Sequence, residues 1–104
     1  MPDRIEMLKN LLAEDPGNTF ARYGLAMETM KAGQLDTAMS EFRALIALDH
    51  NYCAAYFHGG QTLEKMGDID AARAMYEQGI EAEARTGDAH TRSELQAALD
   101  LLPL

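Results

Sequence analysis

The chain has 104 residues, of which 47% are hydrophobic and 25% are charged; this composition is typical of one folded domain and unlike that of a disordered protein. Its 17 acidic residues outnumber its 9 basic residues, and the net charge of −8 argues against a nucleic acid or an anionic membrane as the partner. We read the negative charge mainly as a source of solubility, with attraction of a cationic partner as the alternative.

Cysteine content and hydropathy indicate the compartment. Cys53 is the single cysteine, so the chain has no intramolecular disulfide and is compatible with a reducing cytosol. The N-terminal residues lack the apolar core of a signal peptide, and no apolar run approaches the ~20 residues that a membrane span requires. We therefore expect a cytoplasmic protein without a membrane partner.

The first part of the chain predicts two helices. Asp3 followed by Glu6 matches a capping box, which opens a first helix that the turn Asp15-Pro16-Gly17 ends. A second helix begins at a cap provided by Asn18 or Thr19, and it ends where Gly33 supplies a left-handed stop. β-branched residues are sparse and no useful stretch alternates with period two, so no strand is predicted.

The remainder of the chain predicts four more helices. The third begins near Asp36, Asn51 caps the fourth, and the fifth begins near Asp70. Thr86-Gly87-Asp88 separates the fifth helix from a sixth, which runs from Ala89 to Leu102. The connections are about two to six residues long, as expected between antiparallel neighbours in one helical domain.

The sequence repeats itself after 34 residues, because identical residues recur at that spacing. The identical pairs are Ala21 with Ala55, Lys31 with Lys65, Gly33 with Gly67, Asp36 with Asp70, Ala38 with Ala72, and Ile46 with Ile80. A fixed period of this size predicts a stack of like units, each of which buries its apolar face on its neighbour.

This pattern resembles the tetratricopeptide repeat, whose unit is two antiparallel helices in 34 residues. The matching residues are Leu25-Ala26, Gly33, Leu35, Ala38 and Phe42 in one unit, and Tyr56, Gly60, Gly67, Ile69, Ala72 and Tyr76 in the next. The resemblance implies an all-α fold, a right-handed superhelix of antiparallel helix pairs with about six helices. The small residues fit close helix crossings, and Arg22 departs from the pattern because the family favours a large aromatic residue there.

Positions outside the two full units divide the chain further. Residues 1–18 resemble the second half of a truncated unit, residues 19–52 and 53–86 are the two repeats, and residues 87–104 form a capping helix. We expect all of them to belong to one domain, because no linker, low-complexity tract or charge block divides the chain. The capping helix departs from the repeat pattern because terminal repeats present a polar outer face to solvent.

The resemblance also implies that the first helix of each unit lines a concave groove. On the second predicted helix, apolar side chains form an arc about 80° wide that is separate from the packing face. The predicted partner-binding residues are Phe20, Tyr23, Met27 and Met30 on this arc, and Phe57, His58, Gln61 and Glu64 at or beside its equivalent on the fourth helix. The alternative is that the N-terminal helix covers Phe20, Tyr23 and Met27 and makes them core residues.

The sequence offers little support for chemistry. Cys53 and His58 are five residues apart, which places them about 140° apart on a helix, so neither a metal-ligand pattern nor a Cys-His nucleophile results. We predict no catalytic residue, no metal and no cofactor. In the family's carboxylate-clamp subclass, Lys, Asn and Arg line the groove; here Tyr23, Met27, His58 and Gln61 stand at those positions, which disfavours that subclass.

The predicted function is therefore a non-enzymatic protein–protein interaction module that binds a peptide or helix of a partner in its groove. Two alternatives stay open. The apolar tail of residues 101–104 suggests a structural protein that forms a homodimer or larger homo-oligomer. Less favoured is a metal or thiol site formed by His50, Cys53 and His58.

Overall fold

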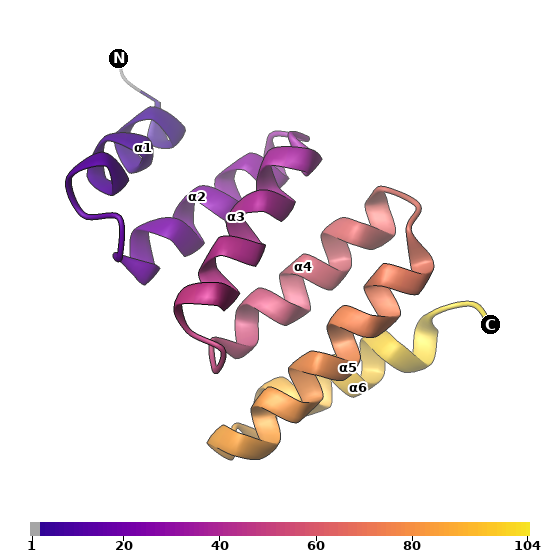
Figure 1. Cartoon of the computed structure of the whole chain (residues 1–104). Coiled ribbons are helices and arrows are strands. Elements are labelled where there is room, and N and C mark those ends of the chain that lie inside the picture. The colour runs from indigo at the N-terminus through magenta and orange to yellow at the C-terminus, as the bar shows by residue number, and fades with distance from the viewer. Residues whose placement is uncertain (1–2) are drawn as a thin grey trace.

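The computed structural model describes residues 3–104, which form six α-helices and no β-strand (Figure 1). The helices are α1 (Arg4–Glu14), α2 (Thr19–Lys31), α3 (Leu35–Leu48), α4 (Cys53–Lys65), α5 (Ile69–Thr86) and α6 (Ala89–Leu101). The first two residues of the predicted half-unit 1–18 lie outside the described residues. No helix of residues 3–104 is both long enough and apolar enough to cross a membrane.

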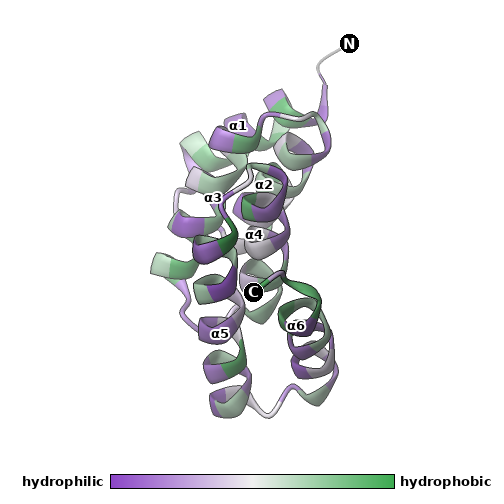
Figure 2. Ribbon diagram, turned by 90° about the vertical axis from the view of Figure 1, so that its right-hand side faces the viewer, coloured by the Kyte–Doolittle hydropathy of each residue, from purple (hydrophilic) through white to green (hydrophobic). Residues whose placement is uncertain are grey.

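The helices form an elongated solenoid with principal extents of 43 × 29 × 19 Å. Each helix packs on the next along the chain, and in addition α2 contacts α4 and α4 contacts α6. As a result α2, α4 and α6 share one side of the stack, while α3 and α5 lie on the other (Figure 1). Every helix mixes hydrophobic and hydrophilic residues along its length (Figure 2), as expected of amphipathic helices that bury one face.

The helix ends follow the local sequence closely, with one exception. Asn18 caps α2, because its side chain accepts a hydrogen bond from the Ala21 N–H at 2.9 Å. Gly33 and Gly67 adopt left-handed φ values of 80° and 82° after α2 and α4, as the repeat predicts. The prediction that Asn51 caps α4 is wrong: Tyr52 is the N-cap residue, and the Asn51 side chain instead accepts a hydrogen bond from Arg85 Nε at 2.9 Å.

The core has two parts. A small cluster joins α1 to α2 and consists of Leu8, Leu12, Ala21 and Leu25. The main core runs from α2 to α6, with Phe42, Tyr76 and Leu95 fully buried among its members. Phe42 and Tyr76 occupy equivalent places in the two repeats, so the 34-residue period reappears as a repeated packing unit.

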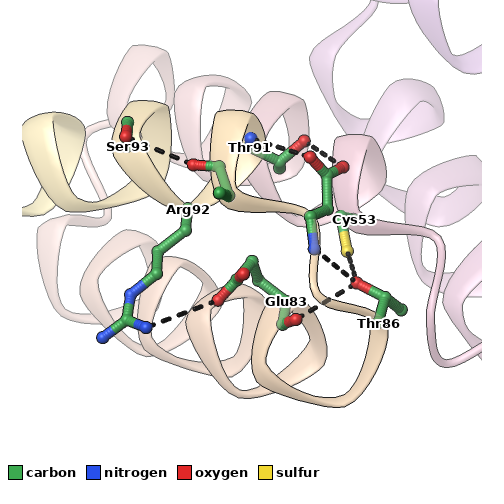
Figure 3. Close-up of polar contacts among 8 residues, drawn as sticks. Cys53, Glu83, Thr86, Thr91, Arg92 and Ser93 are labelled. Atoms are coloured by element: carbon green, nitrogen blue, oxygen red, sulfur yellow. Dashed lines mark hydrogen bonds and ion pairs between the residues drawn. The ribbon is translucent and has the colours of Figure 1, made fainter.

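A polar cluster lies where α5 meets α6 (Figure 3). Glu83 on α5 is only 4% exposed, and Arg92 Nη1 on α6 lies 3.8 Å from its Oε2 atom. The Thr86 hydroxyl donates to the Glu83 carbonyl oxygen at 3.2 Å and lies 3.6 Å from Cys53 Sγ. These contacts tie the end of α5 both to the capping helix and to the start of α4.

Candidate functional site

Four rings form a row across α2 and α4, which we call the aromatic row: Tyr23, Tyr52, Phe57 and His58. The ring centroids of Tyr23 and Tyr52 are 5.3 Å apart, those of Tyr23 and His58 are 6.1 Å apart, and those of Phe57 and His58 are 5.1 Å apart. All four side chains are partly exposed. The row therefore presents a connected, half-open aromatic surface.

A groove follows the row on the side of α6. This α4–α6 groove has a volume of about 370 Å³, at the lower end of the usual range for ligand pockets. Its lining consists of Phe57, Gln61 and Glu64 from α4, Tyr76 from α5, and Glu94, Ala97, Ala98 and Leu101 from α6. Phe57 belongs to both the row and the groove, so the two surfaces are continuous.

Seven of the eight predicted partner-binding residues reach the surface. Tyr23, Phe57 and His58 lie in the aromatic row, and Gln61 and Glu64 lie in the α4–α6 groove. The remaining two line a smaller hollow of about 240 Å³ on α2: Phe20, which is 76% exposed, and Met27, which is half-buried.

Met30 is the exception among the predicted binding residues. Its side chain is 9% exposed and belongs to the main core, so we leave it out of the candidate surface. Met30 lies about one turn after Met27, near the end of α2, and at that end of the helix the predicted arc faces the core instead of the open side.

The N-terminal helix reaches the edge of this surface only through Arg4, which lines the hollow and pairs with Glu28 at 3.1 Å, and it does not cover Phe20 as the alternative prediction required. Leu8 and Leu12 of α1 pack on Ala21 and Leu25, a different face of α2. Leu8 also closes on Gly24, where an added Cβ would lie 3.2 Å from Leu8 Cδ2. Phe20 consequently stays exposed.

Two parts of the site were not predicted from the sequence. Tyr52 precedes α4 and so lies outside the helical arcs of α2 and α4. The α6 wall lies in the capping helix, where the 34-residue period no longer applies. Leu95 of that helix is fully buried, while Glu94, Ala97, Ala98 and Leu101 line the groove.

Three rings of the aromatic row carry hydrogen-bonding atoms and are neutral at pH 7: Tyr23, Tyr52 and His58. Burial lowers the pKa of His58, although its contact with Gln61, Nδ1 to Oε1 at 3.0 Å, opposes this shift. Burial raises the pKa of Tyr23, and the nearby hydroxyl of Tyr52 and carboxylate of Glu94 add to the effect. These groups therefore contribute shape and dipoles to the surface, without charge.

One hydroxyl links the core to the groove. The Tyr76 ring is fully buried, yet its hydroxyl donates a hydrogen bond to the Glu64 carboxylate in the groove. Burial and this carboxylate raise the pKa of Tyr76 well above its usual range, so the hydroxyl stays a donor. Glu64 is thereby held in place on its wall.

The three residues of the suspected metal or thiol site have separate roles. The His50 carbonyl oxygen accepts from the Tyr56 hydroxyl at 2.8 Å, and Cys53 Sγ donates to the Asn51 carbonyl oxygen at 3.4 Å. His58 instead belongs to the aromatic row. Among residues 3–104, no group of three or more His, Cys, Asp or Glu is placed to hold a metal ion.

Known proteins share this sequence pattern. A family model described as Tetratricopeptide repeat matches residues 5–63, and a second model with the same description matches residues 54–86. A TPR repeat-containing protein of Pseudomonas aeruginosa is 30% identical to the chain over 95 residues, which are 91% of this chain and 90% of that protein.

Solved structures share the fold. The solution structure of protein BPP2914 from Bordetella parapertussis is 32% identical, with a TM-score of 0.83 over 96% of this chain and 87% of that one. The type III secretion chaperone SycD of Yersinia enterocolitica, in complex with a peptide of the translocator YopD, is 19% identical. Its TM-score is 0.75 over 89% of this chain and 75% of that one, a similarity of fold.

Proposed function

Because the chain belongs to the tetratricopeptide-repeat family, we propose that it binds a segment of a partner protein along the aromatic row and the α4–α6 groove. Members of this repeat class are typically interaction modules, and the proposed role of this chain is non-enzymatic. The buried thiol of Cys53 agrees with action in the reducing cytoplasm.

The observation that carries the proposal is the half-open aromatic row. Tyrosine, histidine and phenylalanine rings left partly exposed on one connected surface are typical of protein-binding sites, because they bury much area with little loss of side-chain freedom. Met27 beside the row adds an unbranched side chain that adapts to different partners. The proposed ligand is the apolar face of a helix or an extended peptide, the two modes in which such surfaces bind protein segments.

The structural relatives agree with this use of the fold. SycD was solved with a peptide of the translocator YopD, so an architecture similar to this one accommodates a peptide ligand. At 19% identity the similarity concerns the fold, and the identity of the partner is a separate matter.

Site-specific photocrosslinking tests the proposal. A benzoyl-phenylalanine placed at Met27 or Gln61 should crosslink one or more partner proteins in a lysate of the source organism, and mass spectrometry identifies them. The same group at Leu48 on α3, which is 48% exposed on the other side of the stack, is the control. Crosslinks that form equally at position 48, or at none of the three positions, would reject the proposal.

Self-association is the second candidate function, and the C-terminal segment favours it. Leu101 is 85% exposed and Leu104 is fully exposed, while Leu102 is buried and Arg73 Nη2 donates to the Pro103 carbonyl oxygen at 2.5 Å. The tail is thus fixed with two leucines facing outward, which is an apolar patch that a second copy could cover. Light scattering that shows only monomer at high protein concentration would remove this candidate.

A further inference from the structure

The α4–α6 groove combines carbon surface with two carboxylates on facing helices. Phe57, Ala98 and Leu101 contribute apolar lining. Among residues 3–104, Glu64 on α4 and Glu94 on α6 are the only charged residues that line the groove, and no lysine or arginine does so. Its chemistry is therefore apolar and acidic at once.

No basic side chain of arginine or lysine neutralises the two groove carboxylates. Within residues 3–104, the ion pairs shorter than 4.0 Å that involve arginine use Glu28, Glu41 and Glu83, so neither groove carboxylate has an arginine or lysine partner. Glu64 accepts from the neutral Tyr76 hydroxyl. Glu94 contacts Nε2 of the exposed His90 at 2.9 Å.

The influence of Glu94 extends over the neighbouring surface. Its carboxylate raises the pKa of Tyr23 on α2 and acts in the same direction on His58 on α4. Burial outweighs this effect at His58 and lowers its pKa, so the imidazole stays neutral at pH 7 and does not offset the carboxylates. Lys31 on α2 acts on His58 in the opposite direction, so the acidic character is confined to the α6 side, where Glu64 and Glu94 line the groove.

We propose that the α4–α6 groove receives a basic amphipathic segment of the partner, with an arginine or lysine head group between Glu64 and Glu94. The proposal rests on the function proposed above and adds the chemistry of the ligand. The aliphatic stem of the basic residue lies along Leu101 and Ala98, and its head group stacks near the Phe57 ring. The net charge of −8 also accelerates the encounter with a basic segment.

Other occupants fit the groove less well. An acidic segment would meet two carboxylates of like charge. A purely apolar segment would strip water from Glu64 and Glu94 without giving them a partner, which is costly. A second copy of this chain brings its own net charge of −8. The basic amphipathic segment is the occupant that satisfies both components of the lining.

Selection from a random peptide library tests this inference. Peptides of about 15 residues, long enough to form a marginal helix, are selected on the full chain. We expect the selected peptides to be enriched in arginine and lysine beside apolar residues. Their affinity should fall about threefold to thirtyfold in the Glu64→Gln/Glu94→Gln variant, from the range measured for exposed ion pairs. Higher salt should also lower the affinity of these peptides for the natural chain, because it screens the attraction between the charges.

Two variants complete the design. Glu77→Gln/Glu81→Gln removes the same amount of charge from exposed positions on α5 and should change affinity less than about twofold. Leu101→Lys places a cation at the mouth of the groove, at a side chain that is 85% exposed. This variant should also bind basic peptides with lower affinity.

The outcomes separate this inference from the proposed function. Peptides that are neutral or acidic, depend on Met27 and ignore the Glu64→Gln/Glu94→Gln change would overturn the inference and leave the proposed function standing. A selection that yields no binder, or only binders indifferent to Met27→Lys and Leu101→Lys, would overturn both. An equal loss in the α5 control variant would also overturn the inference, since it would show an effect of overall charge alone.

Discussion

The Tyr76 ring lies directly against the backbone of Gly60. A Cβ atom added at Gly60 would come within 2.2 Å of Tyr76 Cε1, closer than side-chain carbons approach one another. The adjacent Gly59 is different, because an added Cβ there would meet Met75 Cγ at 3.6 Å, an ordinary van der Waals contact. Of these two neighbouring glycines, only Gly60 has to be small because of a close contact.

We expect Gly60→Ala to lower the free energy of unfolding by about 1–3 kcal/mol, because the fully buried Tyr76 ring has to move. Gly59→Ala is the matched control: it should leave stability unchanged or raise it by up to about 1 kcal/mol through helix propensity. Urea denaturation followed by circular dichroism measures both. Equal stability of the two variants would show that the ring adjusts freely.

The repeat made most of the fold predictable, because it records where helices must approach closely. Ala38 and Ala72 are both fully buried, and Gly33 and Gly67 both take the left-handed conformation that ends a helix. The family pattern and the local stop signals agree at these positions. That agreement is why the order and type of all six helices were predicted correctly.

The site was less predictable, since a helical arc does not reveal which neighbour covers it. Met27 and Met30 share one arc, yet the first is half-buried beside Tyr23 and the second packs in the core. Tyr52 and Glu94 reach the site from outside the compared arcs, one before α4 and the other on the capping helix. Tertiary packing decides these details.

The contacts of Arg22 explain why this residue replaces the large aromatic residue that the family favours. Its Nη1 donates to Glu41 Oε2 on α3 at 2.8 Å, and Nη2 donates to the Pro16 carbonyl oxygen at 3.1 Å. Both side chains of the pair are 18% exposed. We expect Arg22→Ala to lower the free energy of unfolding by about 1–3 kcal/mol, the usual range for hydrogen bonds to charged groups. A double-mutant cycle with Glu41→Gln isolates the pair, and strictly additive losses would refute the coupling.

His58 should make stability depend on pH. Burial lowers its pKa in the folded chain, so below the ordinary histidine pKa of about 6.5 the unfolded chain binds the proton more readily. The free energy of unfolding should therefore fall as the pH drops through that value. A titration of the His58 Cε1 proton by NMR, with a midpoint at or above the ordinary value, would contradict this.

A substitution assigns the pH effect to this residue. His58→Gln should remove part of the decrease in stability between about pH 7.5 and pH 5.5, because glutamine does not titrate. His50→Gln, at an exposed position, should retain it. Urea denaturation at the two pH values provides the comparison, and an unchanged slope in His58→Gln would place the effect elsewhere.

Glu83 is a buried carboxylate with an incomplete set of partners (Figure 3). Its Oε2 atom has no hydrogen-bond partner among residues 3–104, and the Arg92 side chain that faces it at 3.8 Å is itself 61% exposed. Such a pair gains little Coulomb energy because water screens the arginine, while the carboxylate has lost its own hydration. We expect Glu83→Met, which keeps the volume, to leave the free energy of unfolding unchanged or to raise it by about 1–4 kcal/mol.

Removal of Arg92, which faces Glu83, should change the free energy of unfolding in the opposite direction, and it tests the same physical cause. Arg92→Ala should lower the free energy of unfolding by about 1 kcal/mol in the natural chain, because it leaves Glu83 buried without a counter-ion. In a Glu83→Met background the same change should have almost no effect, since no buried charge remains. Urea denaturation of the four chains completes the cycle. A clear loss of stability in Glu83→Met alone would mean that the carboxylate itself holds α6 on α5, and that its burial is compensated by more than Arg92.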